Sequence, residues 1–402
     1  MTASDSFIPY GRQDVTAEDI EAVSETLRSD FLTSGPRVEE FEEAFARCVG
    51  SRYAVAVCNA TAALHLAMRV TGIGPGDRVV TSPNTFLASA SCASFVGATP
   101  DFSDIDPKSY NLCADTLEAK WHDDTRAVVA VAYAGQAPDM PRIGELCRSK
   151  SAVIIEDACH GTGGGFHHEG SSYKLGGHPW ADITTFSFHP VKAMTTGEGG
   201  ILVTDNESYA NRARHLRSHG VTRASGDFLG IGSDSHAEME RGSWYYEMNE
   251  LGYNYRITDI QCALGLSQLG RIDTYAQRRR DIVAAYNKAF AGVPHLKTPA
   301  VTRPEDIDQI SWHLYTTLID FEKLGLTRTA YMAKLREVGV GSQVLYIPVH
   351  LQPYYRETLG YGAGKCPNAE RYYRHALSLP LFPSMTDTEV NRVIEAVTAI
   401  HP

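Results

Sequence analysis

Short apolar runs alternate with helix-forming segments through the first half of the 402-residue chain, and this alternation constrains the fold more than any other feature. The runs that predict strands are YAVAVC, RVVTSP, AVVAVAYAG, SAVIIEDA and residues 183–188. Helix-like segments separate them, among them ALHLAMRVTG, residues 88–96 and residues 141–148. Strands joined by crossover helices pair in parallel, so we expect an α/β fold whose mostly parallel sheet is covered by helices on both sides.

The two ends of the chain have their own patterns. Thr16 precedes an acidic first turn and predicts the start of a helix that runs to about Arg28. Residues 257 to about 290 have helical spacing, with the basic run 278–280 on that helix. Further along, HLYTTLIDF and QVLYIPV are typical of strands, and TRTAYMAKLREVG and residues 387–400 are typical of helices.

These patterns divide the chain into three parts. We expect an N-terminal arm and helix at 1–30, a large domain at 31–265 and a small α+β domain at 266–402. Glycine-rich residues 161–177 and polar residues 223–243 are expected to be loops.

Composition excludes several classes of protein. The net charge of -11 argues against a nucleic-acid binder, because phosphate backbones attract clustered lysine and arginine. The eight cysteines form no C-x-x-C pair, so neither a zinc site nor a disulfide framework is indicated, and we expect no metal. The N-terminus has no signal-peptide pattern and no apolar run reaches membrane-spanning length, so we expect a cytoplasmic protein with no membrane partner.

The segment SFHPVKAMTTGEGG carries the first candidate catalytic residue, Lys192. Pro190 and the following glycines predict a tight turn between two strands, so the lysine is expected to be poorly solvated. A desolvated amine loses its charge more easily and becomes a nucleophile, as a Schiff-base lysine must. An ordinary surface-loop lysine is the alternative, and the residues upstream decide between them.

Asp157 ends a predicted strand, and in an open α/β sheet such positions face the ligand crevice. A carboxylate there could keep a heterocyclic nitrogen protonated, as pyridoxal phosphate chemistry requires. A helix N-cap aspartate is the alternative. His160 follows three residues later and is either a cofactor contact or an ordinary core or surface histidine.

The turn at 59–62 joins a predicted strand to a helix, and its small residues would let a phosphate approach the helix N-terminus. A plain capped helix is the alternative. Ser187 could add a hydroxyl to the same phosphate, and Phe86 could lie against a flat ring or belong to the core. Taken together and in this order, these residues predict one pyridoxal phosphate site.

The chain resembles the DegT/DnrJ/EryC1/StrS sugar aminotransferases over nearly its whole length. The fragments CNATAALHLA, SPNTFLASASC, IEDACH, SFHPVKAMTTGEGG and LRSHGVTR carry this resemblance, together with WYYEMNELGYNYRITDIQCALGLSQL and YIPVHLQPYY. The resemblance implies the type I pyridoxal-phosphate fold of aspartate aminotransferase, with a large, mostly parallel sheet domain and a smaller α+β C-terminal domain.

The resemblance also assigns roles to individual residues. It makes Lys192 the covalent lysine and Asp157 the partner of the pyridine nitrogen. The remaining cofactor contacts that it implies are Phe86 on the ring, His160 near the ring hydroxyl, and Thr61, Ala62 and Ser187 at the phosphate. Asn254 would reach the phosphate of a neighbouring subunit, which implies a homodimer with shared active sites. Ala62 stands where many relatives have serine or threonine, so one phosphate contact is expected from backbone alone.

The implied reaction is transfer of an amino group from glutamate to a keto-sugar, with 2-oxoglutarate as the by-product. Within the family, the chain is most similar to members that act on the C4 ketone of a UDP-linked 4-keto-6-deoxy-N-acetylhexosamine in pseudaminic acid biosynthesis. A dehydratase of the same family carries histidine in place of the lysine, so Lys192 favours transamination. A non-catalytic ligand sensor is the other alternative, and the complete set of site residues argues against it. Tyr346 and His350 either line the sugar pocket or are structural.

Overall fold

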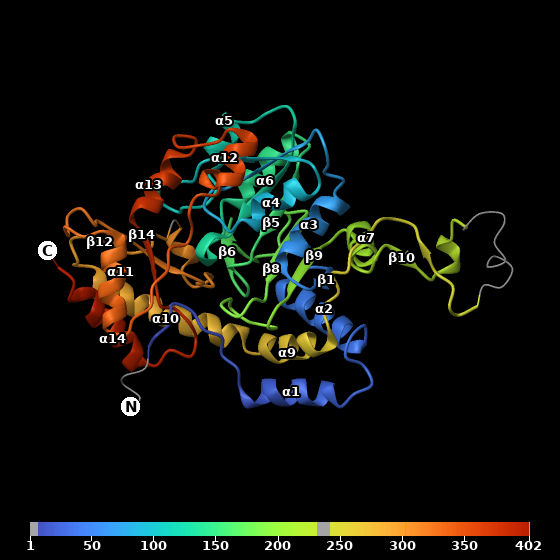
Figure 1. Cartoon of the computed structure of the whole chain (residues 1–402), viewed down its shortest axis with the longest axis horizontal. Helices are drawn as coiled ribbons and strands as arrows, with labels where there is room; N and C mark the ends of the chain where they lie inside the picture. The colour runs from blue at the N-terminus through green and yellow to red at the C-terminus, as the bar shows by residue number, and fades with distance from the viewer. Residues whose placement is uncertain (1–6, 231–241, 302, 402) are drawn as a thin grey trace.

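A seven-stranded sheet forms the centre of the molecule (Figure 1). The computed structural model describes residues 7–230, 242–301 and 303–401. The strands occur in the order β1-β9-β8-β5-β4-β2-β3. Their bounds are β1 Tyr53–Val57, β2 Arg78–Thr81, β3 Thr99–Phe102, β4 Thr125–Val131, β5 Val153–Asp157, β8 Ile183–Ser187 and β9 Gly200–Thr204. Five of the strands, from β8 to β3, are parallel to one another, and β9 is antiparallel to both of its neighbours. The predicted mostly parallel α/β sheet is confirmed.

Helices cover both faces of this sheet because its central strands are apolar on both sides. Within β5, Ile154 belongs to one buried cluster and Ile155 to the other. The first face is covered by α2 (Pro36–Val49), α5 (Ala114–Ala119), α6 (Met140–Ser149) and α9 (Asp259–Leu269). The second is covered by α3 (Ala60–Val70), α4 (Ala88–Phe95) and α7 (Glu207–Arg217). The N-terminal helix α1 (Ala17–Leu27) packs outside α9 (Figure 1).

A smaller α+β unit with its own core follows. Its elements are α10 (Ile272–Phe290), β12 (Leu296–Lys297), β13 (Tyr315–Ile319), α11 (Arg328–Glu337), α12 (Pro353–Leu359), α13 (Pro367–His375), β14 (Ala376–Leu379) and α14 (Asp387–Thr398). The three strands form an antiparallel sheet in the order β12-β13-β14. The helix expected over 257–290 is two helices, because the chain turns at Gly270 and Arg271, close to the proposed domain boundary.

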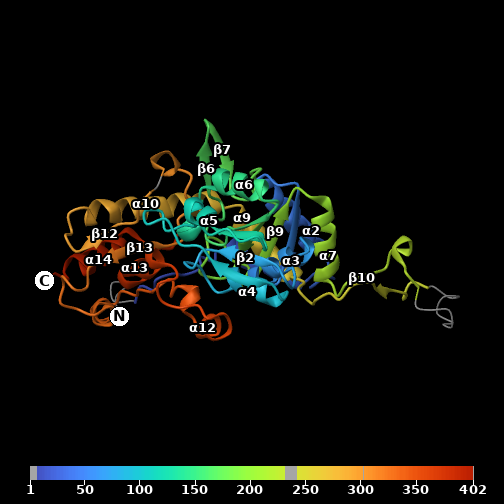
Figure 2. The ribbon, with the colours of Figure 1, turned by 90° about the horizontal axis from the view of Figure 1, so that it is seen from above.

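Two segments expected to be irregular contain strands. Residues 161–177 include the hairpin of β6 (Gly165–His168) and β7 (Ser171–Lys174), which projects from the body in Figure 2. The loop prediction was wrong here because glycines masked an alternating pattern: Phe166 and Tyr173 lie opposite each other, and their rings stack with centroids 5.8 Å apart. Glu169 and Gly170 turn the hairpin, both with positive φ.

The segment 223–243 is only partly irregular. A short helical turn η3 (Ser225–Asp227) lies between β10 (Val221–Thr222) and β11 (Glu247–Met248), which pair antiparallel. This pair extends away from the body of the molecule in both Figure 1 and Figure 2. Residues 231–241 lie outside the described part of the chain.

The prediction of a strand at QVLYIPV was also wrong. Gln343 pairs with Ser378, but the residues after it form no ladder. The carbonyl of Leu345 instead accepts a hydrogen bond from the Tyr133 hydroxyl, and the Tyr346 hydroxyl bonds to His160. Side-chain contacts with the large domain therefore replace strand pairing.

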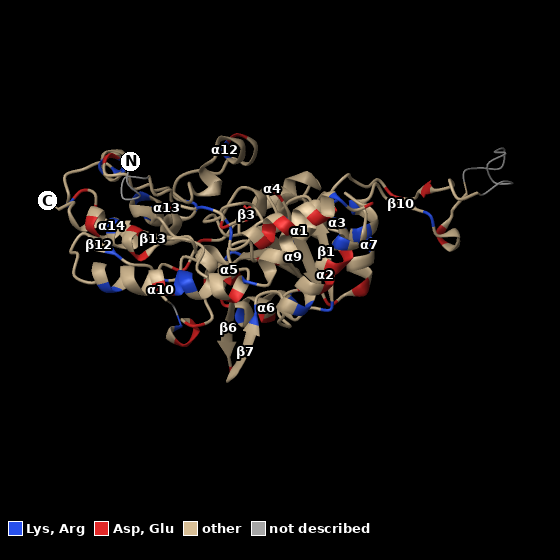
Figure 3. Cartoon of the chain, turned by 90° about the horizontal axis from the view of Figure 1, so that it is seen from below, with Lys and Arg blue, Asp and Glu red and all other residues tan. Residues whose placement is uncertain are grey.

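Charge is mixed over the surface. In the view of Figure 3, lysines and arginines are scattered among acidic residues on the labelled helices. Among the residues that the structure describes, no helix is long and apolar enough to cross a membrane.

Candidate active site

A cavity of about 470 Å³ lies at the carboxyl ends of the parallel strands. Strands β5 and β8 are parallel neighbours, so the residues that follow them open onto the same edge of the sheet. The predicted site residues that line this cavity are Thr61, Phe86, Asp157, His160, Ser187 and Lys192. Two predicted contacts, Ala62 and Asn254, do not line it.

Lys192 sits in the turn between β8 and β9. Its backbone N–H donates to the His189 carbonyl at 2.9 Å, and the Thr196 N–H donates to the Phe188 carbonyl at 3.0 Å, which closes the turn. The residue is half-buried, and its side chain lines the cavity. Burial lowers the pKa of the ammonium group below its ordinary value, with Cys159 and Asp157 partly opposing the shift. The amine therefore loses its proton more readily than a surface lysine, as a nucleophile must.

Asp157 is held from two sides at the end of β5. Its Oδ2 accepts a hydrogen bond from the Ser89 hydroxyl at 2.6 Å, and its Oδ1 accepts from the Cys159 N–H at 3.1 Å. Because the Ser89 proton is used in this way, the 2.7 Å contact between Thr85 and Ser89 is a bond donated by Thr85. No helix follows β5 directly, so Asp157 is not a helix cap. The chain thus holds a carboxylate facing the cavity in one orientation.

The N-terminus of α3 forms another wall. Ala60 and Thr61 line the cavity, and the first-turn N–H groups of a helix lack intrahelical acceptors. The Asn59 side chain caps this helix by accepting from the Ala62 N–H at 2.9 Å, while the Ala62 side chain is packed in the core. Ala62 is therefore behind the wall rather than on it. A Cβ on Gly200 would lie 2.4 Å from the Asn59 carbonyl carbon, so only glycine lets β9 approach this turn.

His160 and Tyr346 form a hydrogen-bonded pair beside the lysine. The Ala134 N–H donates to His160 Nδ1 at 3.3 Å, so Nδ1 is an acceptor and Nε2 carries the proton. His160 Nε2 then donates to the Tyr346 hydroxyl at 3.0 Å. Burial, followed by the charge of Lys192, holds the pKa of His160 well below its ordinary value, so the ring is neutral. His313 packs against the same ring, with centroids 4.5 Å apart.

The remaining predicted residues have clear positions. Phe86 is 56% exposed at the mouth of the cavity, so it is not a core phenylalanine. Tyr346 lines the cavity, whereas His350 is buried outside it and bonds to Glu370 at 3.1 Å. Asn254 is exposed and pairs with Ser218.

The sequence prediction missed several residues at the site, among them Tyr10, Ser89, Cys159 and His313. Ser89 and Thr85 had a signal, since both lie in the small-residue segment that follows β2. Tyr10 had none: it reaches the cavity because the neighbouring Ile8 pairs with Val340 of the small domain.

These groups fit pyridoxal phosphate. A buried amine of lowered pKa, an anchored carboxylate and a helix N-terminus surround one cavity, and each matches one functional group of that cofactor. Among the residues that the structure describes, no cluster of three or more histidine, cysteine, aspartate or glutamate side chains could hold a metal ion.

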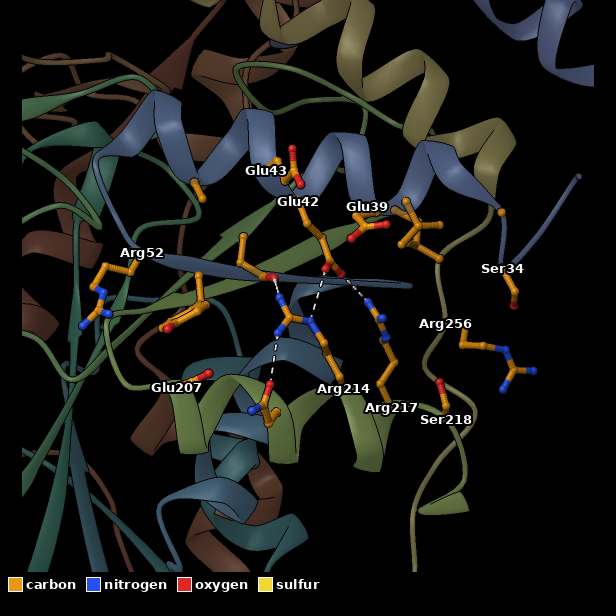
Figure 4. Close-up of a pocket in the computed structure, with 17 residues that line it drawn as sticks. Ser34, Glu39, Glu42, Glu43, Arg52, Glu207, Arg214, Arg217, Ser218 and Arg256 are labelled. Atoms are coloured by element: carbon orange, nitrogen blue, oxygen red, sulfur yellow. Dashed lines mark hydrogen bonds and ion pairs between the residues drawn. The ribbon is translucent and has the colours of Figure 1, made fainter. Parts of the chain in front are cut away.

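A larger hollow of about 690 Å³, drawn in Figure 4, lacks these features. Glu42 points from α2 toward two arginines of α7, as the figure shows. Its Oε1 lies 2.5 Å from Arg217 Nη1 and its Oε2 lies 3.4 Å from Arg214 Nε. The four glutamates and four arginines that line this hollow balance in charge, so we assign it a structural role.

Comparison with known proteins yields a consistent set of relatives. The profile of the DegT/DnrJ/EryC1/StrS aminotransferase family matches residues 13–398. The spore coat polysaccharide biosynthesis protein SpsC of Bacillus subtilis is 42% identical over 398 residues, which are 98% of this chain and 97% of SpsC.

Solved structures agree over the same length. Helicobacter pylori PseC, an aminotransferase involved in the biosynthesis of pseudoaminic acid, superposes with a TM-score of 0.86 at 27% identity, covering 98% of this chain and 99% of PseC. The PLP form of Spr1654, a putative sugar aminotransferase from Streptococcus pneumoniae, superposes with a TM-score of 0.86 at 30% identity, covering 98% of each chain.

Proposed function

The chain belongs to the DegT/DnrJ/EryC1/StrS aminotransferase family and is a pyridoxal-phosphate-dependent sugar aminotransferase, and from this premise we propose that it aminates the C4 ketone of a UDP-linked 4-keto-6-deoxyhexosamine. Glutamate is the amino donor. The observation that carries the proposal is the meeting of Lys192 and Asp157 in one cavity. The likeness to the Helicobacter pylori enzyme supports this choice of sugar.

In this proposal the chain's own groups divide the work. Pyridoxal phosphate, when bound, supplies an electron sink for the electron pair left by a departing α-proton. Lys192 would hold the cofactor through its amine, and the same amine, when free, would accept and return the substrate's proton as a general base and acid. Its lowered pKa suits it to accept that proton. Asp157 would keep the ring nitrogen protonated, and Ser89 and the Cys159 N–H hold the carboxylate in place.

The walls of the cavity position the reactants. The N-terminus of α3 and Ser187 would hold the phosphate, since both line the cavity and Ser187 pairs with Gly200, which lies against the Asn59 turn. Neutral His160 fixes the Tyr346 hydroxyl without adding a charge near Lys192. Phe86 at the mouth would cover the ring and limit the entry of water.

A product assay tests the substrate. The purified holoenzyme is incubated with glutamate and a panel of nucleotide-linked keto-sugars, and the products are identified by NMR and mass spectrometry. We expect 2-oxoglutarate and a 4-amino sugar with the UDP-linked 4-keto-6-deoxyhexosamine, and no turnover with Lys192→Ala. A deoxygenated sugar would identify a dehydratase, and another preferred sugar would overturn the substrate assignment.

A chemical test addresses the covalent residue. Borohydride reduction of the holoenzyme followed by peptide mapping should place the cofactor on Lys192. The yellow holoenzyme should also bleach when glutamate is added. A protein that binds the cofactor but does not bleach would favour a ligand sensor.

We further propose a homodimer in which Asn254 reaches the phosphate bound by the partner. Asn254 is exposed and outside its own cavity, which supports this arrangement. Lys192→Ala and Asn254→Ala are expected to be inactive alone. After denaturation and joint refolding in equal amounts, mixed dimers contain one intact site, so roughly a quarter of the wild-type activity should return. No recovery would contradict the shared site.

A further inference from the structure

A separate cavity of about 440 Å³ lies between the small sheet and α13. Strands β12 and β13 form one wall, α13 forms another, and Pro107 and Tyr110 of the large domain close it. None of the residues that line the active-site cavity lines this one. Its polar and charged lining residues are Tyr110, His295, Lys297, Asp320, Asn368, Arg371, Tyr372 and His375.

His295 is the least explained of these residues. Its side chain lines the cavity but is only 4% exposed, and both ring nitrogens are buried without a hydrogen-bond partner. Burying an imidazole in this way costs free energy, and such groups in native proteins usually have a partner. An unpaired polar ring facing a cavity therefore indicates a missing ligand.

The cavity is also locally basic in a chain whose net charge is -11. Lys297 lies on β12 and Arg371 lies on α13, against a single lining carboxylate, Asp320. Arg371 Nη2 donates to Asn368 Oδ1 at 3.1 Å, which leaves most of its five N–H donors for a ligand. His375 Nδ1 donates to the Ile319 carbonyl at 3.0 Å, so Nε2 of the neutral ring is an acceptor.

We propose that this cavity binds a small phosphorylated molecule, up to the size of a nucleotide. Lys297 and Arg371 from two walls, with the unpaired ring N–H of His295, suit a phosphate group, which accepts several charge-assisted hydrogen bonds. Tyr110 and Tyr372 lie with ring centroids 4.5 Å apart and their planes at 41°, and they provide aromatic surface for a base or sugar ring. The volume is within the range of small-molecule sites.

A short chain of hydrogen bonds would connect the bound ligand to the active site. The Tyr133 hydroxyl donates to the Leu345 carbonyl at 2.5 Å, so the 2.8 Å bond between the two tyrosine hydroxyls is donated by Tyr372. Leu345 and Tyr346 line the active-site cavity. A ligand that contacts both Tyr110 and Tyr372 would tie the large domain to α13, so we expect it to raise the thermal stability of the protein.

Calorimetric titration of the holoenzyme tests this proposal, because the bound cofactor already fills the phosphate site of the active centre. The probes are inorganic phosphate, pyrophosphate and UMP, with citrate and 2-oxoglutarate as carboxylate anions. We expect a phosphorylated probe to bind at least about 10-fold more weakly to the double variant Lys297→Gln/Arg371→Gln. Arg374→Gln is the matched control, because Arg374 is exposed on the same helix and does not line the cavity.

A second variant separates binding from folding. His295→Leu removes an unpaired buried imidazole, so it should not lower the melting temperature. We nevertheless expect it to weaken the binding of the phosphorylated probe. Equal affinity in the wild type, His295→Leu and the double variant would overturn the proposal. So would the absence of binding by every phosphorylated probe, or tighter binding of a carboxylate. The aminotransferase assay is independent of these outcomes.

Discussion

At the scale of single residues, a side chain at the end of β5 and another from the turn after the neighbouring strand β8 carry the proposed chemistry. Lys192 is a desolvated amine of lowered pKa, and Asp157 is an anchored carboxylate in the same cavity. Burial lowers the pKa of Lys192, and the negative charge of Asp157 opposes part of that shift. The pair therefore combines a reactive amine with a fixed negative charge.

Removing the carboxylate tests this division of roles. Asp157→Ala should lower kcat by about 10²- to 10³-fold or more, because no group then holds the proton on the ring nitrogen. Ser89→Ala removes one hydrogen bond to the carboxylate and leaves its charge, so a much smaller loss is expected. Steady-state kinetics with glutamate and the keto-sugar measure both. Near-normal turnover of Asp157→Ala would contradict the role.

A second residue makes stability depend on pH. His65 is buried against Phe95, Tyr253 and Tyr255, and burial, then the charge of Arg69, lowers its pKa from 6.5 to about 4. The unfolded chain therefore takes up a proton below pH 6.5 while the folded chain does not until about pH 4. The stability is fully present above pH 6.5 and is lost as the pH falls toward 4, by at most about 3 kcal/mol for this group.

Replacing this ring isolates its contribution. His65→Phe keeps an aromatic ring in the cluster and cannot take up a proton, so its free energy of unfolding should fall less between pH 7 and pH 4.5. Urea unfolding of both proteins at the two pH values gives the comparison. The other buried histidines contribute equally to each protein. The same pH dependence in both would rule out His65 as the source.

At the scale of elements, the antiparallel strand β9 shapes the phosphate end of the cavity. It lies between β1 and β8, and Gly200 is opposite Val57 on one side and Ser187 on the other. This register places the Gly200 backbone directly against the turn at Asn59 that starts α3. The position of the helix N-terminus therefore depends on one residue of a neighbouring strand.

Adding one methyl group there should disturb the site. Gly200→Ala places a Cβ 2.4 Å from the Asn59 carbonyl carbon, where backbone must move, so we expect weaker cofactor binding and about 1–3 kcal/mol of destabilisation. Gly292→Ala is the control, because nothing lies within 4 Å of its added Cβ. Cofactor absorbance during dialysis and thermal melting measure both effects. Unchanged cofactor retention in Gly200→Ala would show that the turn tolerates the shift.

At the scale of the whole molecule, a buried arginine on α10 connects the lysine turn to the small domain. Burial lowers the pKa of Arg279 to about 10. Its guanidinium donates to the carbonyls of Leu381 at 2.9 Å and Lys192 at 3.4 Å, and also to those of Trp312 and His313. The sequence placed Arg279 only within a basic run on a helix. In the structure its side chain is buried, whereas the neighbouring Arg278 and Arg280 are partly exposed.

Truncating this contact tests its importance. Arg279→Met leaves several buried carbonyls without donors, and we expect a loss of about 3 kcal/mol or more in stability together with a lower kcat. Arg280→Met, at a partly exposed neighbour, should have little effect. Thermal melting, kinetics and cofactor absorbance distinguish a displaced lysine turn from general unfolding. A stable Arg279→Met enzyme with normal kcat would show that the Lys192 turn keeps its conformation without this contact.

The sequence alone determined the features that contiguous residues encode. Alternating apolar runs and turn residues specified the α/β order, the strand that ends at Asp157 and the turn that carries Lys192. These residues in their order also predicted a pyridoxal phosphate site, and the family resemblance then assigned a role to each of them. Predictions failed where a local signal was weak or misleading, as in the glycine-masked hairpin at 165–174 and the missing strand around Leu345.

Only the tertiary structure decided which distant residues meet. Ser89 reaches Asp157, His160 reaches Tyr346, and Arg279 reaches Lys192 across 68, 186 and 87 positions of sequence respectively. No spacing pattern encodes such contacts, because they arise when whole elements pack and buried polar groups must find partners. Periodicity in neighbouring residues sets the elements, and the packing of those elements sets the charges and hydrogen bonds of the site.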